Sequence, residues 1–327
     1  MTSPQTWHLL GAGAIGCLWA AHLTRAGLHT TLILKETHRA NWPGHISLCD
    51  ANATPHETLT VAAATTDQIQ PSEIENLLIT TKAFDALSAV LPLKPLLSNA
   101  KNIVVMINGL GPQQQVLEQL APHLPKNCRF WAASTTNGAW CPARFQVVEA
   151  GIGLTTFGKL SLNKNHSITS DGDDSPPQLP FDAQGISLPC KAVTNIGTVL
   201  WRKLAINCAI NPLTAINQVR NGQLAEQPEL TKQMRTVCEE VEAVAHGLKL
   251  SLFDSQFKAP LFDRAVEVAI ATGANYSSMY QDVLHKRPTE VDVMTGYLLA
   301  QARLLNIDCP QNQSLFEQVK HLEDTKQ

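Results

Sequence analysis

The sequence has no long run of hydrophobic residues and no surplus of positive charge. No stretch of about 18 apolar residues occurs, so we expect no membrane-spanning helix. Lysine and arginine number 25 against 28 acidic residues, and the net charge is −3. Binding to nucleic acid or to an acidic membrane surface favours a basic excess. We therefore expect neither partner, and an anionic ligand would need a few placed cations or backbone N–H groups.

The eight cysteines are widely spaced, and no Cys-x-x-Cys pair occurs. We therefore predict no metal site. Several cysteines lie in apolar contexts, as Cys208 does, which is typical of reduced thiols packed in a cytoplasmic protein. The opening MTSPQTWHLLGAGAIG lacks both a basic segment and a long apolar core, so no secretory signal is predicted.

What the sequence does contain is a change of pattern near residue 192. Before it, short β-like runs such as TWHLL, TTLIL, NLLITT and NIVVMI alternate with amphipathic stretches, which is typical of βαβ units and a parallel sheet. After it we find only helical periodicity. The predicted helices are 195–217, 222–248, 254–272, 290–306 and 311–325. We predict an α/β domain over 1–192 and an all-helical domain over 193–327, with a polar surface loop at 161–180.

The run GAGAIG has G-x-G-x-x-G spacing between a predicted strand and a predicted helix. In dinucleotide-binding proteins the first glycine allows a tight turn, the second lets the pyrophosphate approach the backbone, and the third lets helix and strand pack closely. N–H groups at the helix N-terminus then bind the phosphates. We predict a Rossmann-type cofactor loop, the alternative being a glycine-rich turn without a ligand. The predicted contacts are Gly11, Ala12, Gly13, Ala14, Ile15 and Gly16.

The residue after the second predicted strand indicates which dinucleotide is bound. An acidic side chain about 20 positions after the loop binds the ribose hydroxyls of NAD, whereas a cation favours the 2′-phosphate of NADP. The strand TTLIL is followed by Lys35 and then by Glu36. Because Lys35 comes first and Arg39 is near it, we favour NADP(H). The alternative, in which Glu36 holds the ribose and Lys35 is simply solvated, stays open.

Polar residues also follow two later strands. Lys82 comes just after LLITT, and Asn108 comes just after IVVMI. Ligands of open α/β sheets bind at the carboxyl ends of the strands, so both residues are placed to reach a nicotinamide ribose or a substrate. Taken singly, Lys82 could be a surface lysine at a helix start, and Asn108 the turn former of an Asn-Gly pair. Their occurrence at successive strand ends favours cofactor binding by both.

The helical half contains an apolar segment with a polar stripe, LWRKLAINCAINPL. Lys203, Asn207 and Asn211 are spaced i, i+4 and i+8, so they lie on one face of a helix. Pro212 follows the stripe, removes one helical hydrogen bond and leaves a carbonyl free. From spacing alone, a lysine that extends from the core beside two hydrogen-bonded asparagines is an equally good interpretation.

Six segments occur in one order: the glycine loop, TTKAFD, INGLG, LWRKLAINCAINPL, NYSSMYQDV and RPTEVDVMTGYLL. In this order, over about residues 7–320, the sequence resembles the 2-dehydropantoate 2-reductase (ketopantoate reductase) family. The resemblance implies an oxidoreductase that uses NADPH to reduce 2-dehydropantoate to (R)-pantoate in pantothenate and coenzyme A biosynthesis. It also implies a cytoplasmic enzyme, a monomer or homodimer, whose active site lies where the two domains meet.

The resemblance assigns roles within the helical half. Lys203 matches the catalytic lysine, whose ammonium stabilises the charge on the ketone oxygen and supplies its proton. Glu290 matches a second residue of the catalytic site, which binds the substrate hydroxyl, and PTEVD predicts that it lies in a first helical turn after Thr289. Ser278 matches a serine that binds the substrate carboxylate. The resemblance also implies that Asn207 and Asn211 help to hold the lysine in place. The implied substrate-binding residues are Asn108, Asn207, Asn211, Asn275 and Ser278.

The sequence departs from the family pattern at three places. Lys35 stands where arginine is usual, and a lysine offers a point charge in place of a bidentate fork. Asp85 stands where glutamine is common, and we exclude it from the contacts because an acid repels phosphate. The 161–180 loop is longer and more polar than expected. Two alternatives stay open: a related reductase of another 2-oxo acid, and a non-catalytic NADP(H)-sensing protein of the same fold.

Overall fold

The computed structural model describes residues 5–162, 168–169, 177–182, 185–250, 252 and 260–325. The chain divides into two compact units. The first comprises Met1–Ile107 and Pro112–Gly197, and the second comprises Asn108–Gly111 and Thr198–Gln327. Most of the predicted 161–180 loop lies outside the described residues. Among the helices that are described, none is long and apolar enough to cross a membrane.

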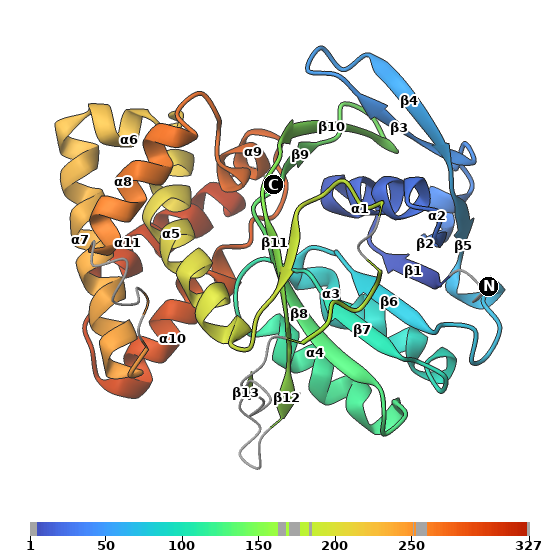
Figure 1. Cartoon of the computed structure of the whole chain (residues 1–327). Coiled ribbons are helices and arrows are strands. Elements are labelled where there is room, and N and C mark those ends of the chain that lie inside the picture. The colour runs from blue at the N-terminus through green and yellow to red at the C-terminus, as the bar shows by residue number, and fades with distance from the viewer. Residues whose placement is uncertain are drawn as a thin grey trace. The chain divides into compact units, whose positions relative to one another are not determined.

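The first unit is an α/β domain on an eight-stranded sheet of order β14-β11-β8-β7-β6-β1-β2-β5 (Figure 1). Its strands are β1 (Thr6–Leu10), β2 (His29–Ile33), β5 (Ala62–Ala64), β6 (Asn76–Ile79), β7 (Asn102–Val105), β8 (Arg129–Thr135), β11 (Thr155–Lys159) and β14 (Cys190–Ala192). The six strands β8, β7, β6, β1, β2 and β5 are parallel to one another. Strand β11 pairs with β8 in the antiparallel direction. The predicted parallel sheet is confirmed.

Helices and short turns connect these strands. They are α1 (Ala14–Arg25), α2 (Glu36–Arg39), α3 (Ala83–Val90) and α4 (Pro112–Leu120), with 3-10 turns η1 (Thr66–Gln68), η2 (Leu91–Leu96) and η3 (Ala121–His123). A two-stranded ribbon joins β12 (Ser161–Leu162) to β13 (Ile168–Thr169). The core holds Trp19, Phe157 and Phe181, whose rings meet pairwise at centroid distances of 5.3–5.8 Å. Their burial fixes α1 on the sheet, and α1 carries the glycine loop at its N-terminus.

A second sheet, which the sequence patterns do not predict, has the order β4-β3-β10-β9. Its strands are β3 (His45–Cys49), β4 (Pro55–Thr60), β9 (Gly138–Trp140) and β10 (Gln146–Gly151). Helix α1 packs against strands of both sheets, as Figure 1 shows. The outer strands β4 and β9 are largely exposed, so they lack the apolar run that marks a buried strand.

The second unit is helical throughout its described residues, which confirms the predicted class. Its helices are α5 (Ile196–Asn217), α6 (Gln223–Glu226), α7 (Pro228–Gly247), α8 (Leu261–Ala271), α9 (Ser278–Leu284), α10 (Thr295–Leu305) and α11 (Pro310–Asp324), with one 3-10 turn, η4 (Val291–Val293). The first two residues of α5 belong to the first unit. Helix α5 continues through Pro212, whose missing N–H leaves the Cys208 carbonyl without its helical donor.

Two helix predictions need correction, and one helix was not predicted. The predicted 222–248 helix is two, because Gln227 is extended and Pro228 starts α7 at a position where proline is favoured. The predicted 290–306 helix begins only at Thr295. Glu290 therefore does not lie in a first helical turn but directly precedes η4. Helix α9 was not predicted, since its seven residues span fewer than two full apolar repeats.

Candidate functional site

The glycine loop, Lys35 and Lys82 follow three neighbouring strands, β1, β2 and β6. Because these strands are parallel, their carboxyl ends share one edge of the sheet. Lys35 is exposed and directly precedes α2, and Lys82 is partly buried and directly precedes α3. The first unit thus gathers along this edge the predicted cofactor residues other than Asn108, which belongs to the second unit.

The three glycines of the loop have different surroundings. Gly11 has a φ of +110°, and a Cβ there would lie 2.7 Å from the Thr81 nitrogen. A Cβ on Gly16 would lie 1.8 Å from the Gly11 carbonyl oxygen. Around Gly13 a Cβ would meet nothing within 4 Å. Gly11 and Gly16 are therefore required by the packing of the loop itself, whereas Gly13 faces open space in which a ligand can approach the backbone.

Two threonines after β6 support this loop. The Thr80 hydroxyl donates to the Gly11 carbonyl at 2.8 Å and so fixes the turn. The Thr81 hydroxyl is buried and has no partner among the described residues. A buried hydroxyl without a partner costs free energy unless a ligand or water satisfies it. The open face at Gly13 and this unpaired hydroxyl both fit a bound dinucleotide phosphate. The sequence signal for both threonines was the run TTK, of which only Lys82 was singled out.

Lys203, Asn108 and Glu290 form a hydrogen-bonded chain within the second unit. The Lys203 ammonium donates to Asn108 Oδ1 at 2.8 Å, and Asn108 Nδ2 donates to Glu290 Oε2 at 3.2 Å. Glu290 is buried, with 5% of its surface exposed. The neutral amide thus lies between a cation and an anion. Because an amide has both a donor and an acceptor, it hydrogen-bonds to both charged groups, and it does not itself titrate.

Burial and a nearby carboxylate determine the pKa of Lys203. Burial lowers the pKa of Lys203 to about 8, although the Glu290 carboxylate acts in the opposite direction. Loss of hydration disfavours the charged ammonium, and the carboxylate restores part of its stability. A pKa near the working pH is the condition under which a general acid is most effective.

Gly109 places Asn108 in this cluster. Asn108–Gly111 belongs to the second unit, and the Leu110 N–H donates to the Val293 carbonyl at 3.0 Å. Gly109 has a φ of +80°, and a Cβ on it would lie 2.4 Å from the Val293 oxygen. The segment NGLG therefore packs onto η4, directly after Glu290. A side chain at position 109 would push it away.

The two other asparagines of the α5 stripe have different environments. Asn211 is buried, and its amide donates to the Met294 Sδ at 3.8 Å. Asn207 is partly exposed, and no described residue hydrogen-bonds to its side-chain amide. The bond that holds the lysine comes from Asn108, whereas the sequence pointed to Asn207 and Asn211 for that role. Asn207 keeps a free amide for a ligand, and contact with substrate stays a prediction for both.

Ser278 and Asn275 lie further along the unit. Both are exposed, and Ser278 is the first residue of α9. Its neighbour Ser277 is buried, caps α9 through the Tyr280 N–H, and accepts from the Thr214 hydroxyl at 2.7 Å. Thr214 is 11 residues after Lys203 on α5, about 16 Å along the helix axis. The structure therefore groups Lys203, Asn108 and Glu290, while substrate contact by Ser278 and Asn275 stays a prediction.

Comparison with known proteins decides the family. The model of "Ketopantoate reductase PanE/ApbA" matches residues 7–161, and that of its C-terminal region matches residues 195–323. The chain is 35% identical over 331 residues to 2-dehydropantoate 2-reductase of Vibrio cholerae, covering 97% of each. The chain belongs to the ketopantoate reductase family. The resemblance drawn from the sequence motifs is confirmed, and members of this family are oxidoreductases with a nicotinamide cofactor.

Further relatives agree with the ketopantoate reductase assignment. A 2-dehydropantoate 2-reductase from Escherichia coli O157:H7 is 32% identical over 323 residues, covering 96% of this chain and 94% of that one. A ketopantoate reductase from Ralstonia eutropha JMP134 superposes with a TM-score of 0.79 at 24% identity, covering 98% and 99%. D-mandelate dehydrogenase, solved with NADH and anilino(oxo)acetate, also gives 0.79, at 19% identity and 98% and 99% coverage. These structures share the fold.

Proposed function

We propose that this protein reduces 2-dehydropantoate to (R)-pantoate with NADPH, as a step of pantothenate biosynthesis in the cytoplasm. The observation that carries the proposal is the chain Lys203–Asn108–Glu290, at 2.8 and 3.2 Å, on a helical unit of this family. Two relatives that share about a third of its residues over nearly their whole length are named 2-dehydropantoate 2-reductase.

When bound, the nicotinamide cofactor supplies a hydride to the ketone carbon. As that carbon gains a hydrogen, the carbonyl electron pair moves to the oxygen, which becomes an alkoxide. The Lys203 ammonium stabilises this charge and donates its proton to the oxygen. Lys203 is then neutral, and a pKa of about 8 lets it recover a proton from water near neutral pH. Asn108 holds the ammonium in place throughout.

The buried Glu290 carboxylate supports the choice of substrate. An ionised carboxylate is only an acceptor, and burial is costly unless hydrogen bonds satisfy its oxygens. Asn108 donates to one oxygen, and each carboxylate oxygen can accept more than one hydrogen bond. A substrate hydroxyl is a suitable further donor, and 2-dehydropantoate carries one. An arylated 2-oxo acid, such as the one related to mandelate, has no hydroxyl and would leave this acceptor without that bond.

The open glycine face, Lys35 and Lys82 support NADPH as the cofactor. Gly13 leaves room for the pyrophosphate, and the Thr81 hydroxyl has no partner among the described residues. Lys35, exposed at the end of β2, is placed for a 2′-phosphate. The adjacent Glu36 is the feature that would instead favour NADH.

The test follows NADPH absorbance in purified protein with 2-dehydropantoate, for wild type and Lys203→Ala. We expect saturable oxidation, lowered about 10²-fold or more in the variant. Wild-type protein that binds NADPH but oxidises it only with another 2-oxo acid would overturn the substrate assignment. The phenyl-substituted 2-oxo acid is the informative competitor, because D-mandelate dehydrogenase shares the fold.

A further inference from the structure

We propose that Arg144 is a second cation for the 2′-phosphate of the cofactor, acting with Lys35 to select NADPH over NADH. Arg144 lies in the turn between β9 and β10 of the four-stranded sheet, which the sequence motifs did not single out. The proposal rests on the assignment of NADPH as cofactor and names a residue that determines that preference.

The turn that carries Arg144 lies between the glycine-loop helix and α2. At its start, the Cys141 thiol is within hydrogen-bonding reach of the Cys17 thiol on α1, and Cys17 in turn contacts the Ala12 carbonyl at 3.5 Å. At its end, the Phe145 ring packs edge-on against Trp42, with centroids 4.6 Å apart. Trp42 follows α2 within one turn. Arg144 is thus placed between the loop that binds the pyrophosphate and the end of β2.

The backbone holds this turn in one conformation. Phe145 has a φ of +64°, which is unfavourable for a bulky side chain. It is stabilised there because its ring is buried against Trp42 and its carbonyl accepts from the Ser47 N–H at 3.0 Å. The Gln146 N–H closes the turn on the Ala143 carbonyl at 3.2 Å. Backbone strain that the surroundings enforce in this way is common where a side chain must be aimed.

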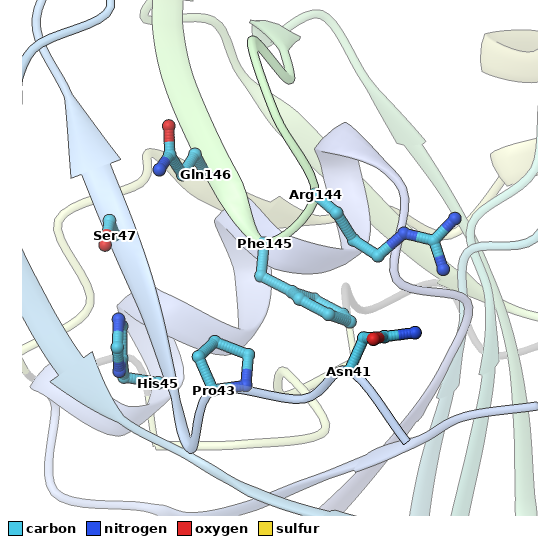
Figure 2. A pocket seen from close by; sticks show the side chains of 7 residues that line it. All are labelled: Asn41, Pro43, His45, Ser47, Arg144, Phe145 and Gln146. Atoms are coloured by element: carbon cyan, nitrogen blue, oxygen red, sulfur yellow. The ribbon is translucent and has the colours of Figure 1, made fainter. Parts of the chain in front are cut away.

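Arg144 lines a cavity of about 480 Å³. Figure 2 shows its exposed side chain extending beyond the Phe145 ring on the side where Asn41 lies. The other lining residues are Pro43, His45, Ser47 and Gln146. The cavity walls offer amide, hydroxyl and imidazole groups, and Arg144 is their one guanidinium. A site of this chemistry suits a phosphate ester and its sugar.

The charges of Arg144 and Lys35 both act on His38, a residue of α2. Burial lowers the pKa of His38, and the positive charges of Arg144 and then Lys35 lower it further. Neither Lys35 nor Arg144 forms an ion pair with an acidic residue in the described part of the chain. The Nε of Arg39, in the same helix, is buried without a partner. Three cations, Lys35, Arg39 and Arg144, gather here beside the single acidic side chain of α2, Glu36, and this surplus of positive charge favours a bound anion.

The chemistry explains why a second cation is needed here. Lys35 offers a point charge, whereas an arginine presents a planar fork that matches two phosphate oxygens. Because a lysine follows β2, the guanidinium comes instead from Arg144, on the four-stranded sheet. A 2′-phosphate would then be held by a charge from one element and by paired N–H donors from the other.

The experiment measures dissociation constants of NADPH and NADH for the full chain by calorimetry, without substrate. We expect Arg144→Gln to weaken NADPH binding about tenfold or more, the scale of a lost charge-assisted hydrogen bond, and to leave NADH binding unchanged. Arg144→Lys should fall between. The matched control is Arg129→Gln, which removes an exposed arginine from the opposite, amino end of β8. It should leave both constants unchanged.

The outcomes separate the inference from the function it rests on. Wild type that binds NADPH more tightly than NADH, with Arg144→Gln losing that preference, supports both. Wild type with the preference and an unaltered variant overturns the role of Arg144 alone. Equal losses for both cofactors would also overturn it, since the side chain would then support the turn and not the phosphate. Wild type that prefers NADH overturns the NADPH assignment itself.

Discussion

Asn108 accepts a hydrogen bond from the Lys203 ammonium at 2.8 Å, and its amide nitrogen donates to Glu290. The lysine and the glutamate therefore influence each other through a neutral group. Asn108 keeps the ammonium oriented, while burial holds its pKa at about 8 although the Glu290 carboxylate acts to raise it. Replacing Asn108 should therefore change the pH dependence of the reaction.

The rate of ketone reduction should fall as pH rises through about 8. Lys203 must be protonated to act as the acid, and the protonated fraction declines through its pKa. In Asn108→Asp a carboxylate would contact the ammonium, raise the pKa of Lys203 by about one unit or more, and move the fall to higher pH. The measurement is kcat/KM against pH. Asn217→Asp, at the far end of α5, is the control and should leave the profile in place. An unshifted profile in Asn108→Asp would remove Lys203 as the titrating acid.

Gly109→Ala should lower both stability and activity. Its φ of +80° costs about 1–3 kcal/mol for a residue with a Cβ, and that Cβ would collide with the Val293 oxygen. Gly44→Ala shares the first cost, with a φ of +86°, but meets nothing within 4 Å. We expect a lower Tm for both variants and a lower kcat/KM only for Gly109→Ala. Equal activity of the two variants would contradict the placement of Asn108 by this contact.

Gly13→Ala and Gly16→Ala should separate cofactor binding from folding. A Cβ on Gly16 collides with the Gly11 carbonyl, so its variant should be destabilised with or without ligand. A Cβ on Gly13 meets only open space, so its variant should keep the wild-type Tm but bind NADPH at least tenfold more weakly, on the scale of a few lost phosphate contacts. Thermal unfolding with and without NADPH distinguishes them. Wild-type affinity in Gly13→Ala would mean that the pyrophosphate does not approach this face.

His8 should make the protein less stable in mild acid. It is 1% exposed on β1, and burial lowers its pKa from 6.5, although Glu73 acts to raise it. Above pH 6.5 both folded and unfolded states hold a neutral imidazole. As pH falls below 6.5 only the unfolded state gains a proton, so the free energy of unfolding declines until the folded pKa is reached. Urea unfolding at pH 7.5 and 5 should show a smaller decline for His8→Leu than for wild type. Equal declines would show that other groups cause it.

The sequence predicted those parts of the fold in which one pattern is dominant. The parallel strands are continuous apolar runs because both faces are buried, and α5 is long enough to show its period. Strands β4 and β9 carry no such run, since they lie at the edges of a small, half-exposed sheet. With that sheet unpredicted, the Arg144 turn had no place in the expected fold.

The sequence predicted which residues belong to the candidate site but not which of them contact one another. The spacing of the polar stripe drew attention to Lys203, and the family motifs assigned the roles of Lys203 and Glu290. The partner of Lys203 was assigned to its own helix, because i+4 neighbours are the only contacts that spacing reveals. The true partner, Asn108, is 95 positions away, and only the tertiary fold brings it there. The sequence did contain the glycine of NGLG, whose need for a positive φ was not linked to the helical unit.

The chain enters the helical unit twice, once for four residues and once for the remainder. A protein cut just before α5, which begins at Ile196, would yield a helical fragment that carries Lys203 and Glu290 but lacks the amide of Asn108. In an exchange of C-terminal halves between relatives, the Asn108–Gly111 segment would come from one parent and Lys203 and Glu290 from the other. One cut divides the sequence of this enzyme into two halves, but the residues of its candidate site come from both of them.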